Sequence, residues 1–571
     1  MDRINPILTS IENDERRAKS VAYSRRKWLS KLLKTGNERV INAYERYDRL
    51  CTENIQNSAV MPKSGAIGPV RPLTVNELSK MSNTEIADYL NNYQETVIIG
   101  MPILAGRGLA DTLAEYVEVE PQRFTDNLLP FQSVRNLYQS SLLRGFLNAW
   151  KDKKTFDWAA LLGFIRSILV SEYFWNEQYE GGFNYRNWVL SGAADLIAEG
   201  TTDDTHAFDA QLLPVAEEIL LILVDKAQQS VSTLDNLPTD VLNSDRGRVF
   251  AAMVGYALRF ARTSQSEYTD CRWPYAIRAD FTKRLDRSVE PSFEFSYTLG
   301  FYLPYLSYLD EEWVRLNINH IFPQRNEDHW QAAFSGYLLH PVREEFYLLL
   351  KAHGHYQKAL STHFADAEVL NELVNHICTG WIEDSENLDD KASLIYQLIH
   401  SSNPNLLAGM VYFFSGRADN LSDKVKVKVM PAWHALFQVL SENRTVAAYQ
   451  EVSCPLLGWL GLVDTIDIEV LGWVKGLIED IDKVPGYYMV LSRFIKALRK
   501  HVLKTPQSVG EIYLAIPQRV MWHLQTEEDE INETVRILYN AGHKETANQI
   551  CNRFGEAGVD FLRAVYEEYR R

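Results

Sequence analysis

Apolar residues recur with helical spacing along most of this chain. From about Pro130 onward, apolar stretches of roughly 12–20 residues alternate with short turns that contain Pro, Gly, Asn or Asp. Strict alternation of apolar and polar residues, the pattern of a half-buried strand, is rare. The pattern therefore predicts an all-α protein, with helices that include residues 158–173, 214–227, 246–261, 312–321 and 367–379.

One stretch, SFEFSYTLGFY at residues 292–302, has the composition of a strand. Because both flanks have helical spacing, we expect a helix there as well. Further helix starts are predicted at two capping boxes, Thr74 with Glu77 and Ser82 with Glu85, where each hydroxyl can accept from an amide one turn later.

The predicted helices come in pairs, although no regular repeat length is evident. Two pairs share a glycine at the turn, Gly354 in FYLLLKAHGHYQKALSTHF and Gly542 in ETVRILYNAGHKETANQICNRFGEAG. Each pair leaves an apolar face for its neighbour to bury, as in arrays of HEAT or tetratricopeptide repeats. The expected fold is an all-α helical-repeat solenoid preceded by a basic N-terminal helix.

Charge and composition divide the chain further. Residues 1–50 contain 12 Lys and Arg against 7 Asp and Glu, a net charge of +5, whereas the whole chain of 571 residues has a net charge of −16. Residues 51–72 are rich in Pro, Gly and Ser and lack helical spacing, which is typical of a linker. We therefore expect a basic helical segment at 1–50, a linker at 51–72, and helical arrays at 73–290 and 291–571.

The spacing of the cysteines and the absence of targeting patterns in the sequence predict the cellular compartment of the protein. The five cysteines lie far apart without a CxxC pair, which favours a reducing environment. The N-terminus lacks the apolar core of a signal peptide, and no apolar run approaches the roughly 18 residues of a membrane span. A cytoplasmic protein without membrane contact is expected.

Motifs for common chemistries are absent from the sequence. It contains no GxxxxGK[ST], HExxH or GxSxG pattern. The local histidine cluster His340, His353, His355 and His363 lacks acidic or thiol partners at ligand spacing, so turn and packing roles are favoured over a metal site. Gly106 and Gly108 are interpreted as part of a loop leading into a helix. No cofactor, metal or catalytic residue is predicted.

Two acidic stretches, IEDSENLDD at 382–390 and IEDIDK at 478–483, could in principle supply paired carboxylates. Both fall at predicted helix ends, where Asp and Glu commonly act as caps and solvated surface. An enzyme with an unrecognised acidic active site, such as a nuclease or nucleotide hydrolase, therefore stays open only as an alternative.

Three passages carry a resemblance to a known group of proteins. They are TVNELSKMSNTEIADYLNNY followed by GRGLADTLAEYVEVEPQRF, then VLNSDRGRVFAAMVGYALRFAR, and HWQAAFSGYLLH with its downstream YQKAL. Together, over about residues 70–370, they resemble the C-terminal helical-repeat regions of large bacterial antiphage proteins, the STAND-type NTPases and some sirtuin-like defence proteins. In that group the array is a sensor that binds a phage protein.

The resemblance implies a non-enzymatic recognition scaffold whose partner is a phage protein or an effector or NTPase subunit. The chain departs from the group because it has no P-loop and too few residues before position 70 for a full effector, so any catalysis is expected in a partner or a missing module. Nucleic-acid binding is disfavoured by the acidic body. The exception is the basic segment, where Arg25, Arg26, Lys27, Trp28 and Lys31 could contact nucleic acid or a partner.

Overall fold

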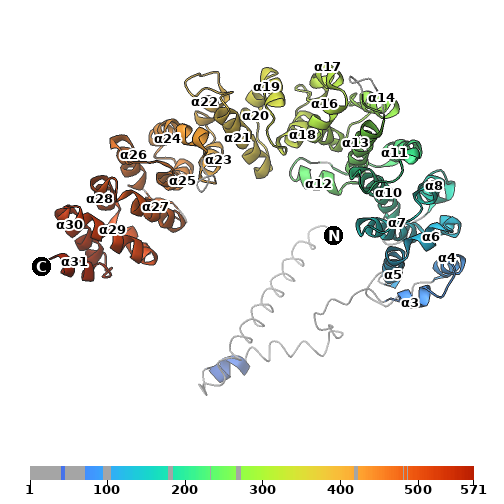
Figure 1. The fold of residues 1–571 in the computed structure, drawn as a ribbon, viewed down its shortest axis with the longest axis horizontal. Coiled ribbons are helices and arrows are strands. Elements are labelled where there is room, and N and C mark those ends of the chain that lie inside the picture. Colours follow the sequence, from blue (N-terminus) through green and yellow to red (C-terminus); the bar gives the residue numbers. More distant parts are fainter. Residues whose placement is uncertain are drawn as a thin grey trace, which may run out of the picture. The chain divides into compact units, whose positions relative to one another are not determined.

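The computed structural model describes residues 40–45, 71–93, 105–177, 184–231, 233–264, 272–416, 422–479, 481–484 and 487–570. Over these residues the chain forms α-helices and short 3-10 helices without a strand, which confirms the predicted all-α class (Figure 1). The chain divides into two units, Met1–Pro72 and Leu73–Arg571. Residues 40–45 of the first unit are helical.

The first half of the second unit contains helices that mostly follow one another after short turns. They are α3 (Val75–Leu78), α4 (Asn83–Asn92), α5 (Ala105–Val119), α6 (Pro121–Thr125), η2 (Leu129–Ser133), α7 (Asn136–Lys151), α8 (Trp158–Leu169), α9 (Glu172–Asn176), α10 (Tyr185–Thr202), η3 (Ala210–Leu212), α11 (Leu213–Lys226), α12 (Leu237–Asn243), α13 (Asp245–Thr263), α14 (Tyr275–Arg284), α15 (Phe293–Phe301) and α16 (Leu303–Leu309).

The second half continues in the same manner. Its helices are α17 (Glu311–Ile321), α18 (Glu327–Leu338), α19 (Glu344–Ala352), α20 (His355–Ser361), α21 (Ala367–Ile382), α22 (Leu394–Ile399), α23 (Pro404–Ser415), α24 (Asp423–Glu442), α25 (Ala447–Leu456), η5 (Leu457–Leu462), α26 (Ile468–Ile478), η6 (Ile481–Lys483), α27 (Tyr488–His501), α28 (Pro506–Ala515), η7 (Gln518–Glu527), α29 (Glu528–Asn540), α30 (Lys544–Glu556) and α31 (Arg563–Arg570).

Local signals in the sequence were accurate predictors of helix ends. Both capping boxes form, with Thr74 and Ser82 each accepting from the amide of the glutamate three residues later and receiving its carboxylate on their own amides. Gly354 and Gly542 have φ of 78° and 85°, the left-handed conformation that ends a helix with least strain on glycine. The strand-like stretch 292–302 is a helix, α15, as expected.

Two local predictions were wrong in detail. Gly106 and Gly108 lie within the first turn of α5 instead of a loop before it, because that helix already begins at Ala105. The predicted single helix at 158–173 is two helices, since α8 ends at Leu169 and Ser171 adopts an extended backbone before α9.

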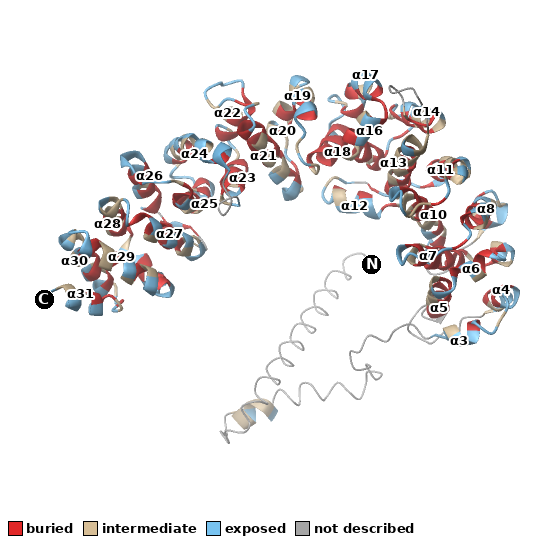
Figure 2. Cartoon of the chain, in the orientation of Figure 1, coloured by how far each residue is buried: buried red, intermediate tan, exposed pale blue. Residues whose placement is uncertain are grey.

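Helices pack on partners that are close in the sequence. α5 packs on α7, and the contacts continue in order through α10, α13, α15, α18, α21, α23 and α25. A parallel series joins α24, α26, α28 and α30. The buried residues lie where neighbouring helices meet (Figure 2), and one connected set of buried apolar side chains extends from Leu78 to Val565. None of the described helices combines the length and apolarity needed to cross a membrane.

A buried ionic cluster joins α13, α14 and α15 at their ends. The Glu290 carboxylate contacts the guanidinium groups of Arg246 and Arg284, with Arg246 Nε at 3.0 Å from Oε1 and Arg284 Nη1 at 3.0 Å from Oε2. Arg246 also donates to the carbonyl oxygens of Val224 and Ala227. Burial raises the pKa of Glu290, but side-chain hydrogen bonds from Arg246 and Ser292 and the charges of Arg246 and Arg284 outweigh it, so the net pKa is lowered. The carboxylate therefore stays charged inside the protein.

Candidate recognition surface

The basic residues that the sequence singled out, Arg25, Arg26, Lys27, Trp28 and Lys31, lie outside the described residues. The same is true of residues 46–70, which include most of the predicted linker. The candidate site lies in the second unit, in the region of α15–α21.

Helices α15 and α18 approach each other unusually closely at two glycines. A Cβ atom placed on Gly300 would lie 1.7 Å from the carbonyl oxygen of Ala333, and one on Gly336 would lie 2.4 Å from the carbonyl oxygen of Tyr297. Both distances are far inside van der Waals contact, so only glycine permits this spacing. The crossing fixes the C-terminal ends of both helices relative to each other.

A series of hydrogen bonds that begins at Tyr337, the residue after Gly336, links α18, α20 and α21. The hydroxyl groups of Tyr337 and Tyr356 are 3.0 Å apart, and the Tyr356 hydroxyl is 2.8 Å from Nδ1 of His376. Nε2 of His376 lies 2.8 Å from the carbonyl oxygen of His340. All of these side chains except His340 are buried.

The donor and acceptor of each of these hydrogen bonds follow from the last acceptor, the carbonyl oxygen of His340. A carbonyl oxygen can only accept, so Nε2 of His376 carries the proton and Nδ1 accepts from Tyr356. Burial lowers the pKa of His376 to about 4, which keeps the ring neutral near pH 7. Tyr337 therefore donates to Tyr356, Tyr356 to His376, and His376 to the His340 carbonyl. The hydrogen bonds of the three buried side chains therefore hold the end of α18 in position.

Glu386 anchors the other side of the same region. Its carboxylate accepts from the Tyr347 hydroxyl at 2.7 Å and from the Leu394 amide at 2.7 Å, and it also contacts Lys351 and Ser393. Glu386 is buried, so the prediction that the acidic stretch 382–390 is only caps and solvated surface was wrong for this residue. A single acid among several exposed ones gives no sequence signal of burial, because its partners lie 7–39 residues away.

Where α15 and α18 end and α16 begins, aromatic side chains reach the surface. The Phe301 and His340 rings are 4.5 Å apart, the Tyr305 and His340 rings 6.0 Å, and the Phe301 and Tyr302 rings 5.0 Å. Tyr305 is 39% exposed and the other three are half-buried. We call Phe301, Tyr302, Tyr305 and His340 the aromatic surface cluster. Burial lowers the pKa of His340, and nearby Arg343 acts in the same direction.

Of the histidines in the predicted cluster, His353 and His355 have stacked rings 6.2 Å apart, whereas His340 and His363 lie in other surroundings. His355 is buried and its Nδ1 accepts from the Trp330 indole at 3.1 Å, while His340 belongs to the aromatic surface cluster. The His363 carbonyl accepts from Gln331. Across the described ranges, no three His, Cys, Asp or Glu side chains come together as a set that could hold a metal ion.

The sequence did not identify the aromatic surface cluster. Its members lie within the apolar segment 299–360, where a half-exposed tyrosine has the same spacing as a buried one. The repeated Tyr at positions 302, 305 and 308 is the one local hint, because a three-residue spacing places them on neighbouring parts of one helix surface. In comparisons with known protein families, curated proteins and solved structures, no match to this chain was found.

Proposed function

We propose that this chain is a non-enzymatic protein-recognition scaffold, built as an α-helical solenoid, and that the aromatic surface cluster contacts its protein partner. The observation that carries the proposal is the cluster itself, a set of half-exposed aromatic rings held on a rigid base. Following the resemblance described above, we propose that the partner is a phage protein or a co-encoded effector or NTPase subunit in a bacterial antiphage system.

The packing order supports the solenoid. In a repeat array each helical pair contacts only its neighbours, and the two series of contacts, one through α23 and α25 and one through α24, α26, α28 and α30, follow this rule. Such arrays present large surfaces without needing a cavity for chemistry. No uniform repeat length accompanies the packing, so the units would differ in size.

The composition of the aromatic surface cluster supports protein recognition. Tyrosine and other aromatic side chains dominate binding energy at protein interfaces, because they offer large apolar area with few rotatable bonds. Here the rings are already positioned by the α15–α18 crossing and by the hydrogen bond to the His340 carbonyl. A partner that binds them would lose little energy to ordering the surface.

The experiment compares partner capture by three forms of the tagged full chain, the unchanged protein, Tyr305→Ala and Tyr412→Ala. Tyr412 is a matched control because it is also an exposed tyrosine, 63% accessible, but lies on α23. Captured proteins are identified by mass spectrometry from cells with and without phage infection, and the affinity of the purified partner is then measured.

We expect Tyr305→Ala to weaken binding of the identified partner by at least tenfold, the effect of truncating an interface aromatic that contributes more than about 1.4 kcal/mol. Tyr412→Ala should bind as the unchanged protein does. Equal affinity of all three forms would exclude the aromatic surface cluster as the contact. If no purified candidate binds and the chain alone cleaves nucleic acid or nucleotide, the enzyme alternative replaces the scaffold.

A further inference from the structure

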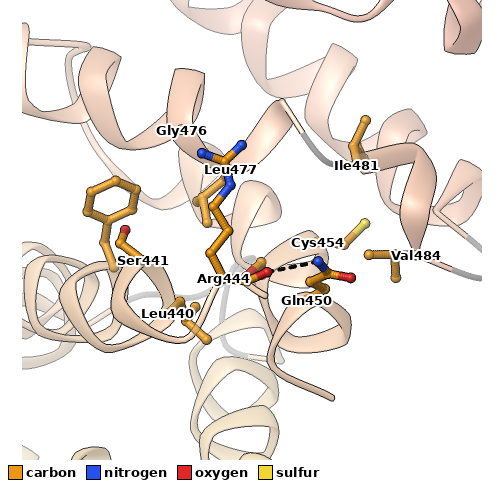
Figure 3. A pocket seen from close by; sticks show the side chains of 11 residues that line it. Leu440, Ser441, Arg444, Gln450, Cys454, Gly476, Leu477, Ile481 and Val484 are labelled. Carbon is orange, nitrogen blue, oxygen red and sulfur yellow. Dashed lines mark hydrogen bonds between the residues drawn. The ribbon is translucent and has the colours of Figure 1, made fainter. Parts of the chain in front are cut away.

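A second feature of the chain is a cavity between α24, α25, α26 and η6, with a volume of about 170 Å³ (Figure 3). Its inner wall is apolar and buried, formed by Leu440, Leu477, Ile481 and Val484 together with the thiol of Cys454. Phe437 and Gly476 complete the wall where α24 meets α26. The packing of neighbouring helices leaves this volume open although the residues around it are large and apolar.

The mouth of the cavity is polar. Ser441, Gln450 and Ser453 lie there with Arg444, and the Gln450 side-chain amide donates to the Arg444 carbonyl at 2.8 Å, which ties α25 to the preceding turn. Figure 3 shows the Arg444 side chain extending toward Leu477 and Gly476. Its guanidinium forms an ion pair with Glu479 at 2.8 Å, and both side chains are partly exposed.

We propose that this cavity binds a small aromatic monocarboxylate, with the ring against the apolar wall and the carboxylate on Arg444. The volume matches a single phenyl-sized group, since a cavity of about 150 Å³ lined by apolar side chains accommodates benzene. A ligand of drug size would not fit, because such ligands need several hundred Å³.

The charge of the ligand follows from Arg444, the cationic side chain among the described residues that line the cavity. A guanidinium has five N–H donors in a fixed fork and accommodates more than one carboxylate, so the pair with Glu479 and a ligand carboxylate are compatible. A cationic ligand would face Arg444 at short range, and a neutral one would gain no ionic contact from the guanidinium beyond its existing pair with Glu479. The site does not depend on the proposed protein partner.

The test measures binding of benzoate to the full chain by ligand-observed NMR and calorimetry. Benzyl alcohol and benzylamine are the neutral and cationic probes of the same size. Arg444→Gln removes the cation, and Ser441→Leu narrows the mouth at an exposed position, where folding is preserved. Arg315→Gln is the matched control, because Arg315 is also an exposed arginine in an ion pair, on α17.

We expect saturable binding of one benzoate, with an affinity at least tenfold above that of benzyl alcohol, the gain of one charge-assisted hydrogen bond. Arg444→Gln should abolish this preference, Ser441→Leu should abolish binding, and Arg315→Gln should change neither. Equal affinity for benzoate and benzyl alcohol would overturn the assignment of a carboxylate. No binding of any probe up to about 10 mM would show that the cavity is not a ligand site.

Discussion

The buried ionic cluster gives the sharpest test of how this fold is held together. In Glu290→Gln the carboxylate becomes a neutral amide of nearly the same shape, so packing is conserved while the charge is lost and one of the two acceptor oxygens becomes an NH2 donor. Glu290 is 1% exposed at its side chain, and the two arginines that contact it are 10% and 4% exposed. The substitution therefore removes the acidic partner of Arg246, whose positive charge stays buried.

The magnitude depends on which arginine has other acidic partners. Arg284 keeps Asp225 at 2.6 Å and Asp280 at 2.7 Å, so its charge stays compensated. Arg246 keeps the carbonyl oxygens of Val224 and Ala227, which are dipoles and not charges. Removing one partner of a buried pair typically costs about 3–5 kcal/mol. Because the glutamine oxygen can still accept a hydrogen bond, we expect a loss of unfolding free energy at the lower end of this range, about 3 kcal/mol.

Amide hydrogen exchange is the appropriate assay, because local opening can be followed without assuming that so long a chain unfolds in one step. Peptides that cover α13–α15 should exchange about 100-fold faster in Glu290→Gln. The control is Glu218→Gln, which breaks the pair with Arg166 whose side chains are 45% and 50% exposed. An exposed pair contributes at most about 1 kcal/mol.

Effects of Glu290→Gln and Glu218→Gln that agree within about 0.5 kcal/mol would refute a special role for the buried charge. A double variant tests the physical cause. If the loss arises from the unpaired charge of Arg246, then adding Arg246→Met to Glu290→Gln should recover part of the protection. Strictly additive losses would show that the carboxylate contributes through something other than that pair.

Three further predictions concern the array itself. Gly336→Ala should destabilise the α15–α18 crossing by several kcal/mol in thermal unfolding, because the added Cβ would clash with backbone atoms. The control is Gly163→Ala, where an added Cβ would have no neighbouring atom within 4 Å. This control should be neutral or stabilising by up to about 1 kcal/mol. Lowering the pH from 7 to 5 should lower the unfolding temperature. Burial lowers the pKa of His355 and His376 to about 4, so between pH 6.5 and 4 the unfolded chain binds protons that the folded chain does not. An unfolding temperature that does not change with pH over this range would contradict the prediction. Deleting residues 544–571 should expose the apolar face of α28 and α29 and cause aggregation in light scattering, and a monomeric, equally stable product would refute the role of the last helices as a cap.

The sequence by itself determined the helices and many of their ends. Helical spacing of apolar residues, the capping boxes at Thr74 and Ser82, and the left-handed glycines Gly354 and Gly542 depend on residues within one or two turns of each other. Even the strand-like stretch 292–302 was correctly predicted as a helix from its flanks. These are local properties, and local sequence is sufficient to specify them.

Only the tertiary structure decided which polar side chains are buried and what they contact. Glu386 belongs to an acidic stretch that was interpreted as helix caps and exposed surface, and His376 contacts Tyr356 and the His340 carbonyl 20 and 36 residues away. The same holds for the aromatic surface cluster and for the cavity beside Arg444, which exist because particular helices pack against each other. Burial is a property of packing between distant segments, and the spacing of residues along one helix does not record it.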